Sequence, residues 1–117
     1  MDFEEVVVDL LRFAATELPT DVGMALKNAM TNEGSPAAKT QLKAIIKNFE
    51  LALEEATPMC QDTGYPIFYV EIGEEALIWA KGLREAIEKG TKRATQEIPL
   101  RPNTVNPIVG GNPGTNT

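Results

Sequence analysis

The sequence contains no histidine and a single cysteine among its 117 residues. Histidine is the commonest general base and metal ligand in proteins, so its absence excludes a Ser-His-Asp or Cys-His mechanism built from this chain alone and leaves a mononuclear zinc site poorly supplied. A lone cysteine cannot form an internal disulfide, and nothing else in the sequence indicates an oxidising compartment. We therefore expect a cytoplasmic protein.

Long hydrophobic runs and clusters of basic residues are also absent. No stretch approaches the roughly 18 apolar residues of a membrane span, and residues 1–5 are acidic where a signal peptide would be basic. Acidic residues outnumber basic ones by 17 to 11, which gives a formal net charge of −6. Because neutralising phosphates requires clustered Lys and Arg, we expect no nucleic-acid partner, and we expect no membrane association.

The length allows one domain at most, and apolar residues at helical spacing predict four helices in it. The first covers about residues 2–18, and Pro19 ends it. The second follows Thr20 as its cap and ends at Gly34. The third covers about 36–56, where Ser35 is suited to cap the helix and Pro36 to its first position; the fourth covers about 75–97, with Gly90 lowering its helix propensity.

Between the last two helices, residues 66–72 are nearly all apolar and rich in β-formers. They predict a mostly buried strand that Gly73 closes. Residues 98–117 are rich in asparagine, proline and glycine and predict an irregular tail. The fold class is therefore mostly α within α+β, with about four helices and one buried strand. A buried strand needs hydrogen-bonding partners, and these could lie in a short unrecognised segment of this chain, on another chain, or in further sequence. We favour further sequence, which makes this chain part of a larger domain.

Seven residues, Pro58-Met59-Cys60-Gln61-Asp62-Thr63-Gly64, form a polar break between the third predicted helix and the predicted strand. Ligands and catalytic groups are often carried by loops that rigid elements position, and a thiol, an amide and a carboxylate are adjacent here. Cys60, Gln61 and Asp62 are therefore candidate site residues. Two other interpretations stay open: Cys60 as a small buried hydrophobic residue, and Asp62-Thr63-Gly64 as an Asx or type I turn.

Arg101 is the second candidate, because it lies between Leu100 and Pro102 in a segment with restricted backbone angles. A guanidinium is suited to bidentate binding of a carboxylate. A plain surface arginine is the alternative interpretation. The tail asparagines and glycines are compatible with an anion-binding loop or, more simply, with turns; the asparagines in question are Asn103, Asn112 and Asn116.

Five motifs in the same order resemble the N-terminal region of the alpha part of class I (iron–sulfur) fumarases and the related L-tartrate dehydratases. The most specific is Pro-x-Cys-Gln-Asp-Thr-Gly, which residues 58–64 match. The others are a helix with alanine and asparagine, a Glu-x-Ser-Pro-x-Ala-Lys helix start, a Val-Glu-Ile-Gly run, and Leu-Arg-x-x-x-Val-x-Pro. They correspond to residues 25–29, 33–39, 70–73 and 100–107. The tail, 112–117, departs from the commoner Asn-Thr-Gly-Asp-Asn-Thr form.

The resemblance implies a hydro-lyase that reversibly hydrates fumarate to malate. Such enzymes bind a [4Fe–4S] cluster through three cysteines, and the open iron acts as a Lewis acid on the substrate. By position, Cys60 would be a cluster ligand. Gln61 and Asp62 would hydrogen-bond the substrate, with Asp62 as the catalytic group, and Arg101 would hold a substrate carboxylate.

One thiolate cannot hold the cluster, and in the resembled family the other two ligands lie further along the alpha part. We therefore expect residues 1–117 to be the N-terminal part of an alpha-type catalytic domain, within a larger α/β region, that is inactive alone. The expected partners are a small dicarboxylic acid and a beta subunit or C-terminal domain of the same enzyme, in an oligomeric assembly.

Three rival interpretations remain open at this stage. The first keeps the family and changes the substrate to tartrate or another hydroxy diacid. The second is a helical interaction module whose unpaired strand recruits a partner, with Cys60 merely structural. The third is a redox-sensing thiol, which would require a lowered thiol pKa; the neighbouring Asp62 and the lack of histidine give no strong cause for one.

Overall fold

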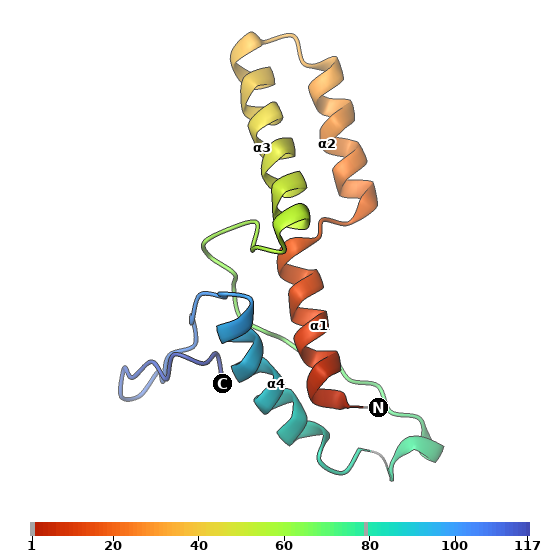
Figure 1. Ribbon diagram of the computed structural model, residues 1–117, viewed down its shortest axis with the longest axis vertical. Helices are drawn as coiled ribbons and strands as arrows, with labels where there is room; N and C mark the ends of the chain where they lie inside the picture. Colours follow the sequence, from red (N-terminus) through yellow and green to blue (C-terminus); the bar gives the residue numbers. More distant parts are fainter. Residues whose placement is uncertain (1, 79) are drawn as a thin grey trace.

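The computed structural model describes residues 2–78 and 80–117, and four α-helices and one short 3₁₀ helix make up its regular structure (Figure 1). The α-helices are α1 (Phe3–Thr16), α2 (Thr20–Asn32), α3 (Pro36–Glu55) and α4 (Leu83–Glu97), and the 3₁₀ helix η1 covers Glu74–Ala76. The prediction of a mostly helical chain is confirmed. Residue 1 of the acidic start and residue 79 of the fourth predicted helix lie outside the described residues.

Local hydrogen bonding explains where the first three helices begin. Asp2 caps α1 by accepting from the Glu4 amide at 3.0 Å, and Ser35 caps α3 as predicted. The prediction that Thr20 caps α2 is wrong, because Thr20 is already the first helical residue. Pro19 takes the cap position, where its carbonyl accepts from the Gly23 amide at 3.0 Å.

The fourth helix is shorter than predicted, since α4 begins at Leu83 rather than near residue 75. Gly82 precedes it with a φ of +89°, in the left-handed region. An α-helix cannot continue through that conformation, because its residues need negative φ values. The predicted N-terminal third of the helix is therefore replaced by η1 and turns.

The prediction of a buried strand at 66–72 is wrong, because the segment is neither a strand nor buried. No strand occurs in the described parts of the chain, and Tyr69 is 94% exposed and Ile67 is 71% exposed. The segment is extended, but a strand also requires a neighbouring strand to pair with its backbone groups. Residues 2–78 and 80–117 supply none, so the β-forming composition of the segment is not realised as a sheet.

The core lies where α4 packs beside α1, and Val8, Ala94, Ile98 and Leu100 form its buried cluster. Gly90 of α4 is buried, close to Val7 of α1. A Cβ atom there would lie 2.7 Å from Cβ and Cγ1 of Val7. The glycine that lowers helix propensity is therefore the residue that lets α4 approach α1.

Charged residues at the same interface also join the two helices. The Arg93 guanidinium on α4 contacts the carboxylate of Glu4 at 3.2 Å and that of Glu5, both on α1. Hydrogen bonding to Glu5 raises the pKa of Arg93 above its ordinary value, so the guanidinium stays charged. These groups are partly exposed, and the contacts will weaken as salt concentration rises.

Helices α2 and α3 form a hairpin that projects away from the α1–α4 pair (Figure 1). Lys27 of α2 bridges to Glu50 of α3 at 3.1 Å and lies over the Phe49 ring at 5.7 Å from its centroid. The molecule is correspondingly elongated, with extents of 56 × 40 × 25 Å. Among the described helices, none combines the length and the apolar character needed to cross a membrane.

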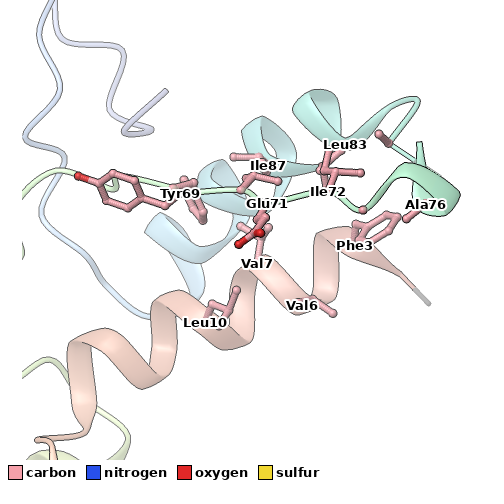
Figure 2. Close-up of a pocket in the computed structure, with 14 residues that line it drawn as sticks. Phe3, Val6, Val7, Leu10, Tyr69, Glu71, Ile72, Ala76, Leu83 and Ile87 are labelled. Carbon is pink, nitrogen blue, oxygen red and sulfur yellow. The ribbon is translucent and has the colours of Figure 1, made fainter. Parts of the chain in front are cut away.

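An apolar groove of about 330 Å³ runs along α1 (Figure 2). Phe3, Val7 and Leu10 of α1 lie on one side, and segment 68–73, α4, and the alanines at positions 76 and 80 contribute to the rest of the lining. Several of the large apolar side chains that line this groove are exposed, among them Leu10 (54%) and Val70 (52%). Exposed apolar surface of this kind is typical of a face that another polypeptide covers.

Candidate functional site

The cysteine loop begins where α3 ends in a left-handed residue. Ala56 caps α3 with φ 50° and ψ 38°. The Thr57 amide then bonds back to the carbonyl of Ala52 at 3.1 Å, which turns the chain off the helix axis. This backbone conformation is usually occupied by glycine, because the Cβ of any other residue strains it.

Replacing Ala56 by glycine is therefore expected to stabilise the chain. Removing the Cβ strain at a left-handed C-cap is worth about 1 kcal/mol, partly offset by the greater entropy of glycine in the unfolded chain. Urea unfolding monitored by circular dichroism measures the change. Alanine-to-glycine replacement at Ala44, inside α3, is the matched control and should instead destabilise by about 1 kcal/mol. A loss of stability on Ala56→Gly would contradict this account.

Two helices fix the backbone immediately before Cys60. The Met59 amide donates to the carbonyl of Ala15 at the end of α1 at 3.0 Å. The Met59 carbonyl accepts from Nδ2 of Asn48 on α3 at 2.9 Å. Cys60 itself is exposed with a free thiol, so its interpretation as a buried hydrophobic residue is wrong. The thiol stands at the surface on a loop whose start is held by α1 and α3.

Asp62 follows in an Asx turn, as one of the sequence interpretations expected. Its Oδ1 accepts from the Gly64 amide at 3.4 Å, and Gly64 has a φ of +72°. The same Oδ1 accepts from Nδ2 of Asn103 at 2.7 Å. That amide nitrogen also donates to the Gly64 carbonyl at 3.1 Å. One asparagine from the tail thus bonds to both ends of the turn.

A second pair of contacts joins the loop to the segment that follows α4. The Arg101 amide donates to Oγ1 of Thr63 at 3.1 Å, and that hydroxyl lies 3.4 Å from the Arg101 carbonyl oxygen, to which it donates. The Arg101 side chain is exposed. Within residues 2–78 and 80–117 its guanidinium makes no ion pair. An exposed guanidinium therefore lies beside the turn at Asp62 and Gly64.

The buried Asn116 side chain forms hydrogen bonds to the backbone of the segment that contains Arg101. It is 7% exposed and has a φ of 56°, a conformation that asparagine tolerates better than most residues. Its Oδ1 accepts from the amides of Asn103 at 2.7 Å and Thr104 at 3.2 Å. Its Nδ2 donates to the Arg101 carbonyl at 3.0 Å and to Oγ1 of Thr95 on α4 at 3.3 Å. All of its side-chain polar capacity is used inside the protein.

These contacts create a shallow pocket of about 390 Å³ whose lining residues are Asp62, Gly64, Tyr65, Arg101 and Asn103. The structure therefore brings Asp62 and Arg101, which are far apart in the sequence, to one pocket. Cys60 and Gln61 are exposed nearby in the chain but do not belong to its lining. At this opening the guanidinium can bind and neutralise a carboxylate of a small acid, and the Asp62 carboxylate can accept a hydrogen bond from a hydroxyl of that acid.

The donor set of this chain cannot hold a metal cluster by itself. In the part of the chain that the structure describes, no group of three or more His, Cys, Asp or Glu side chains is placed to bind a metal ion. The single exposed thiol fits one ligand position, because thiolates are the normal ligands of iron–sulfur clusters and the loop leaves it accessible. Further ligands would have to come from outside these residues.

Comparison with known proteins gives consistent matches over the whole chain. The sequence profile of a family described as fumarate hydratase (Fumerase) matches residues 4–117. A Methanocaldococcus jannaschii protein, provisionally named L(+)-tartrate dehydratase subunit alpha, is 45% identical over 117 residues, which are 99% of this chain and 41% of the relative. A Geobacillus stearothermophilus protein, provisionally named fumarate hydratase class I, is 34% identical over 113 residues, or 96% of this chain and 22% of the relative.

A third relative is the L(+)-tartrate dehydratase subunit alpha of Escherichia coli K12, which is 30% identical over 113 residues. That match covers 97% of this chain and 37% of the relative. The chain thus spans less than half the length of each of these three proteins.

Proposed function

Because this chain belongs to the fumarate hydratase family, we propose that it is the N-terminal part of the alpha-type catalytic region of an iron–sulfur hydro-lyase. In this proposal residues 1–117 are one piece of that domain, with 98–117 as its irregular tail. The reaction is the reversible addition of water to the double bond of fumarate, which gives malate. A free-standing interaction module with a structural cysteine fits the family membership less well.

The observation that carries the proposal is that Asp62 and Arg101 line one pocket, with Asp62 two residues along the chain from the exposed Cys60 thiol. A dicarboxylate needs a cation for at least one of its carboxylates, and Arg101 offers a guanidinium there that forms no ion pair with the described residues. Asp62 is the catalytic group, and it would bond the reacting end of the substrate together with Gln61. Gln61 is exposed and precedes Asp62 in the chain.

Cys60 is proposed as one ligand of a [4Fe–4S] cluster, with the remaining ligands outside this chain. When bound, such a cluster supplies an open iron that acts as a Lewis acid. The contribution of this chain is to hold the thiol at a fixed place through the two backbone bonds of Met59. Arg101 and Asp62 then orient the substrate next to it.

The partner is proposed to be a beta subunit or a further domain of the same enzyme, in an oligomeric assembly. Two relatives are named as alpha subunits, which implies a companion subunit for those proteins. The apolar groove along α1 and the exposed residues of segment 66–72 are surfaces that such a partner would cover. A cytoplasmic location stays a prediction, which fractionation of the source cells would check.

L-tartrate is the second candidate substrate, because the relative with 45% identity carries a tartrate dehydratase name. Both substrates are small hydroxy diacids or their dehydration products, and Arg101 would serve either. Turnover assays with fumarate and with L-tartrate decide between the two.

The decisive assay uses the complete enzyme with its partner, reconstituted with iron and sulfide under anaerobic conditions. We expect turnover of fumarate, malate or L-tartrate, and we expect Arg101→Lys to lower kcat/KM for the preferred diacid about 10- to 100-fold, since lysine cannot grip a carboxylate in a bidentate way. Arg84→Lys, an exposed arginine on α4 outside the pocket, is the matched control.

The 117-residue chain alone should show no turnover in the same assay. A fully reconstituted complete enzyme that turned over none of these diacids would overturn the proposed function. Turnover by the chain alone would overturn its proposed incompleteness.

A further inference from the structure

The strongest unassigned feature outside the proposed catalytic groups is the side chain of Asn103. Its Nδ2 lies 2.7 Å from Oδ1 of Asp62 and 3.1 Å from the Gly64 carbonyl oxygen. Since both neighbours are oxygens, the amide nitrogen, not the amide oxygen, must face them. Asp62 is exposed on a loop, where an isolated carboxylate would populate several rotamers. The two-point contact from Asn103 selects one of them.

Asn103 is itself held by a chain of hydrogen bonds that ends in a helix. Its backbone amide donates to Oδ1 of the buried Asn116 at 2.7 Å. Asn116 Nδ2 donates to Oγ1 of Thr95 at 3.3 Å, and that hydroxyl donates to the Thr91 carbonyl within α4 at 2.8 Å. Because Asn116 and Thr95 are both buried, these bonds are protected from competition with water. Asp62 is thus connected to α4 without relying on its own loop.

We propose that Asn103 is a positioning residue, which holds the Asp62 carboxylate at the mouth of the pocket in the orientation that the reaction needs, and that Asn116 anchors Asn103 to α4. This inference rests on the proposed role of Asp62 as the catalytic group. Asn103 lines the same pocket, yet its donor is directed to Asp62 and Gly64. It therefore acts on the substrate through Asp62.

A purely structural role for Asn103, closing the turn at Gly64, predicts a different result from a positioning role. A structural residue would affect stability or cluster content, whereas a positioning residue affects kcat while substrate binding and cluster content stay the same. The size-matched variant Asn103→Asp keeps the shape of the side chain, removes the donor and places a second carboxylate against Asp62. It should therefore impair turnover at least as much as Asn103→Ala, since like charges repel at this distance.

The experiment compares both variants with the wild type in the complete, reconstituted enzyme. We expect kcat to fall about 10- to 100-fold, which is typical when a group that orients a reactive residue is removed. For Asn103→Ala, the iron and sulfide content and the dissociation constant for succinate, a non-reacting diacid, should stay within a few-fold of the wild type. For Asn103→Asp, the iron and sulfide content should also stay within a few-fold, but the added carboxylate lines the same pocket and should weaken succinate binding as well. Asn106→Ala is the matched control, because among the described residues the Asn106 side chain bonds only the amides of Ile108 and Val109 in its own turn.

A readout independent of turnover is the hydrogen exchange of the Gly64 amide, measured on the cluster-free enzyme. The amide donates to Asp62 Oδ1, so Asn103→Ala should speed its exchange and Asn106→Ala should not. An active wild type with unchanged kcat in both Asn103 variants would overturn the inference. An inactive wild type would overturn the proposed function instead, while unchanged Gly64 exchange would overturn the positioning contact by itself.

Discussion

Replacing Cys60 by serine in the complete enzyme is expected to abolish cluster binding and hydro-lyase activity together. A serine hydroxyl stays protonated at neutral pH and is a poor ligand for iron, whereas a thiolate is the normal ligand. The sequence has no other cysteine to take its place. Loss of the visible absorption of the cluster, iron analysis and the diacid assay measure the effect, and we expect kcat to fall to the background rate.

The exposure of Cys60 makes this test specific. The side chain is not part of the core, so the thermal unfolding temperature of the chain should change little with serine at this position. Any loss of cluster is then a loss of a ligand rather than of the fold. If the serine variant kept its cluster and its activity, Cys60 would be structural, and the interpretation as an interaction module would return.

Replacing Gly90 by alanine should give a large loss of stability, because among the glycines described Gly90 is the one where an added Cβ would lie under 3.0 Å from other atoms. The added Cβ would lie 2.7 Å from two carbons of Val7 and 2.9 Å from the Glu4 carbonyl oxygen. Helix α1 and helix α4 would have to move apart, which would loosen the core formed by Val8, Ala94 and Ile98. Overpacking of this kind costs about 1–3 kcal/mol, even after the gain in helix propensity of alanine.

Gly23→Ala on α2 is the matched control for this prediction. The nearest side-chain atom to its added Cβ is Cζ of Phe49 at 3.9 Å, an ordinary contact. We expect Gly23→Ala to raise the free energy of unfolding by up to about 1 kcal/mol through helix propensity alone. Urea unfolding of both variants gives the comparison, and equal effects at the two positions would refute the close approach of α1 and α4.

The helices were predictable because their signals are local. Ser35, Pro36 and the apolar spacing of α3 act within a few residues of one another, so the sequence placed that helix to within a residue of its end. The start of α4 was predicted wrongly, because the backbone conformation that sets it leaves no signal in the apolar spacing. Apolar spacing continues through residues 75–82, but Gly82 adopts a left-handed conformation that periodicity does not report.

The strand prediction failed because strand formation is not a local property. Residues 66–72 have the composition of a buried strand, yet pairing and burial both depend on a second segment. In the described part of this chain that segment does not exist, and Tyr69 and Ile67 are therefore exposed. The same residues would be buried if a partner covered them.

The candidate site depends both on residues that are adjacent in the sequence and on contacts that only the tertiary structure creates. Cys60, Gln61 and Asp62 are adjacent, so their clustering, the resemblance of their motif and the family it indicates were all available from the sequence. The tertiary structure decided that Arg101 and Asn103 meet Asp62, because turns and hydrogen bonds through Asn116 bring segments roughly forty residues apart to one pocket. Gly90 was likewise a weak helix residue in the sequence and became a packing requirement only once α4 lay against Val7.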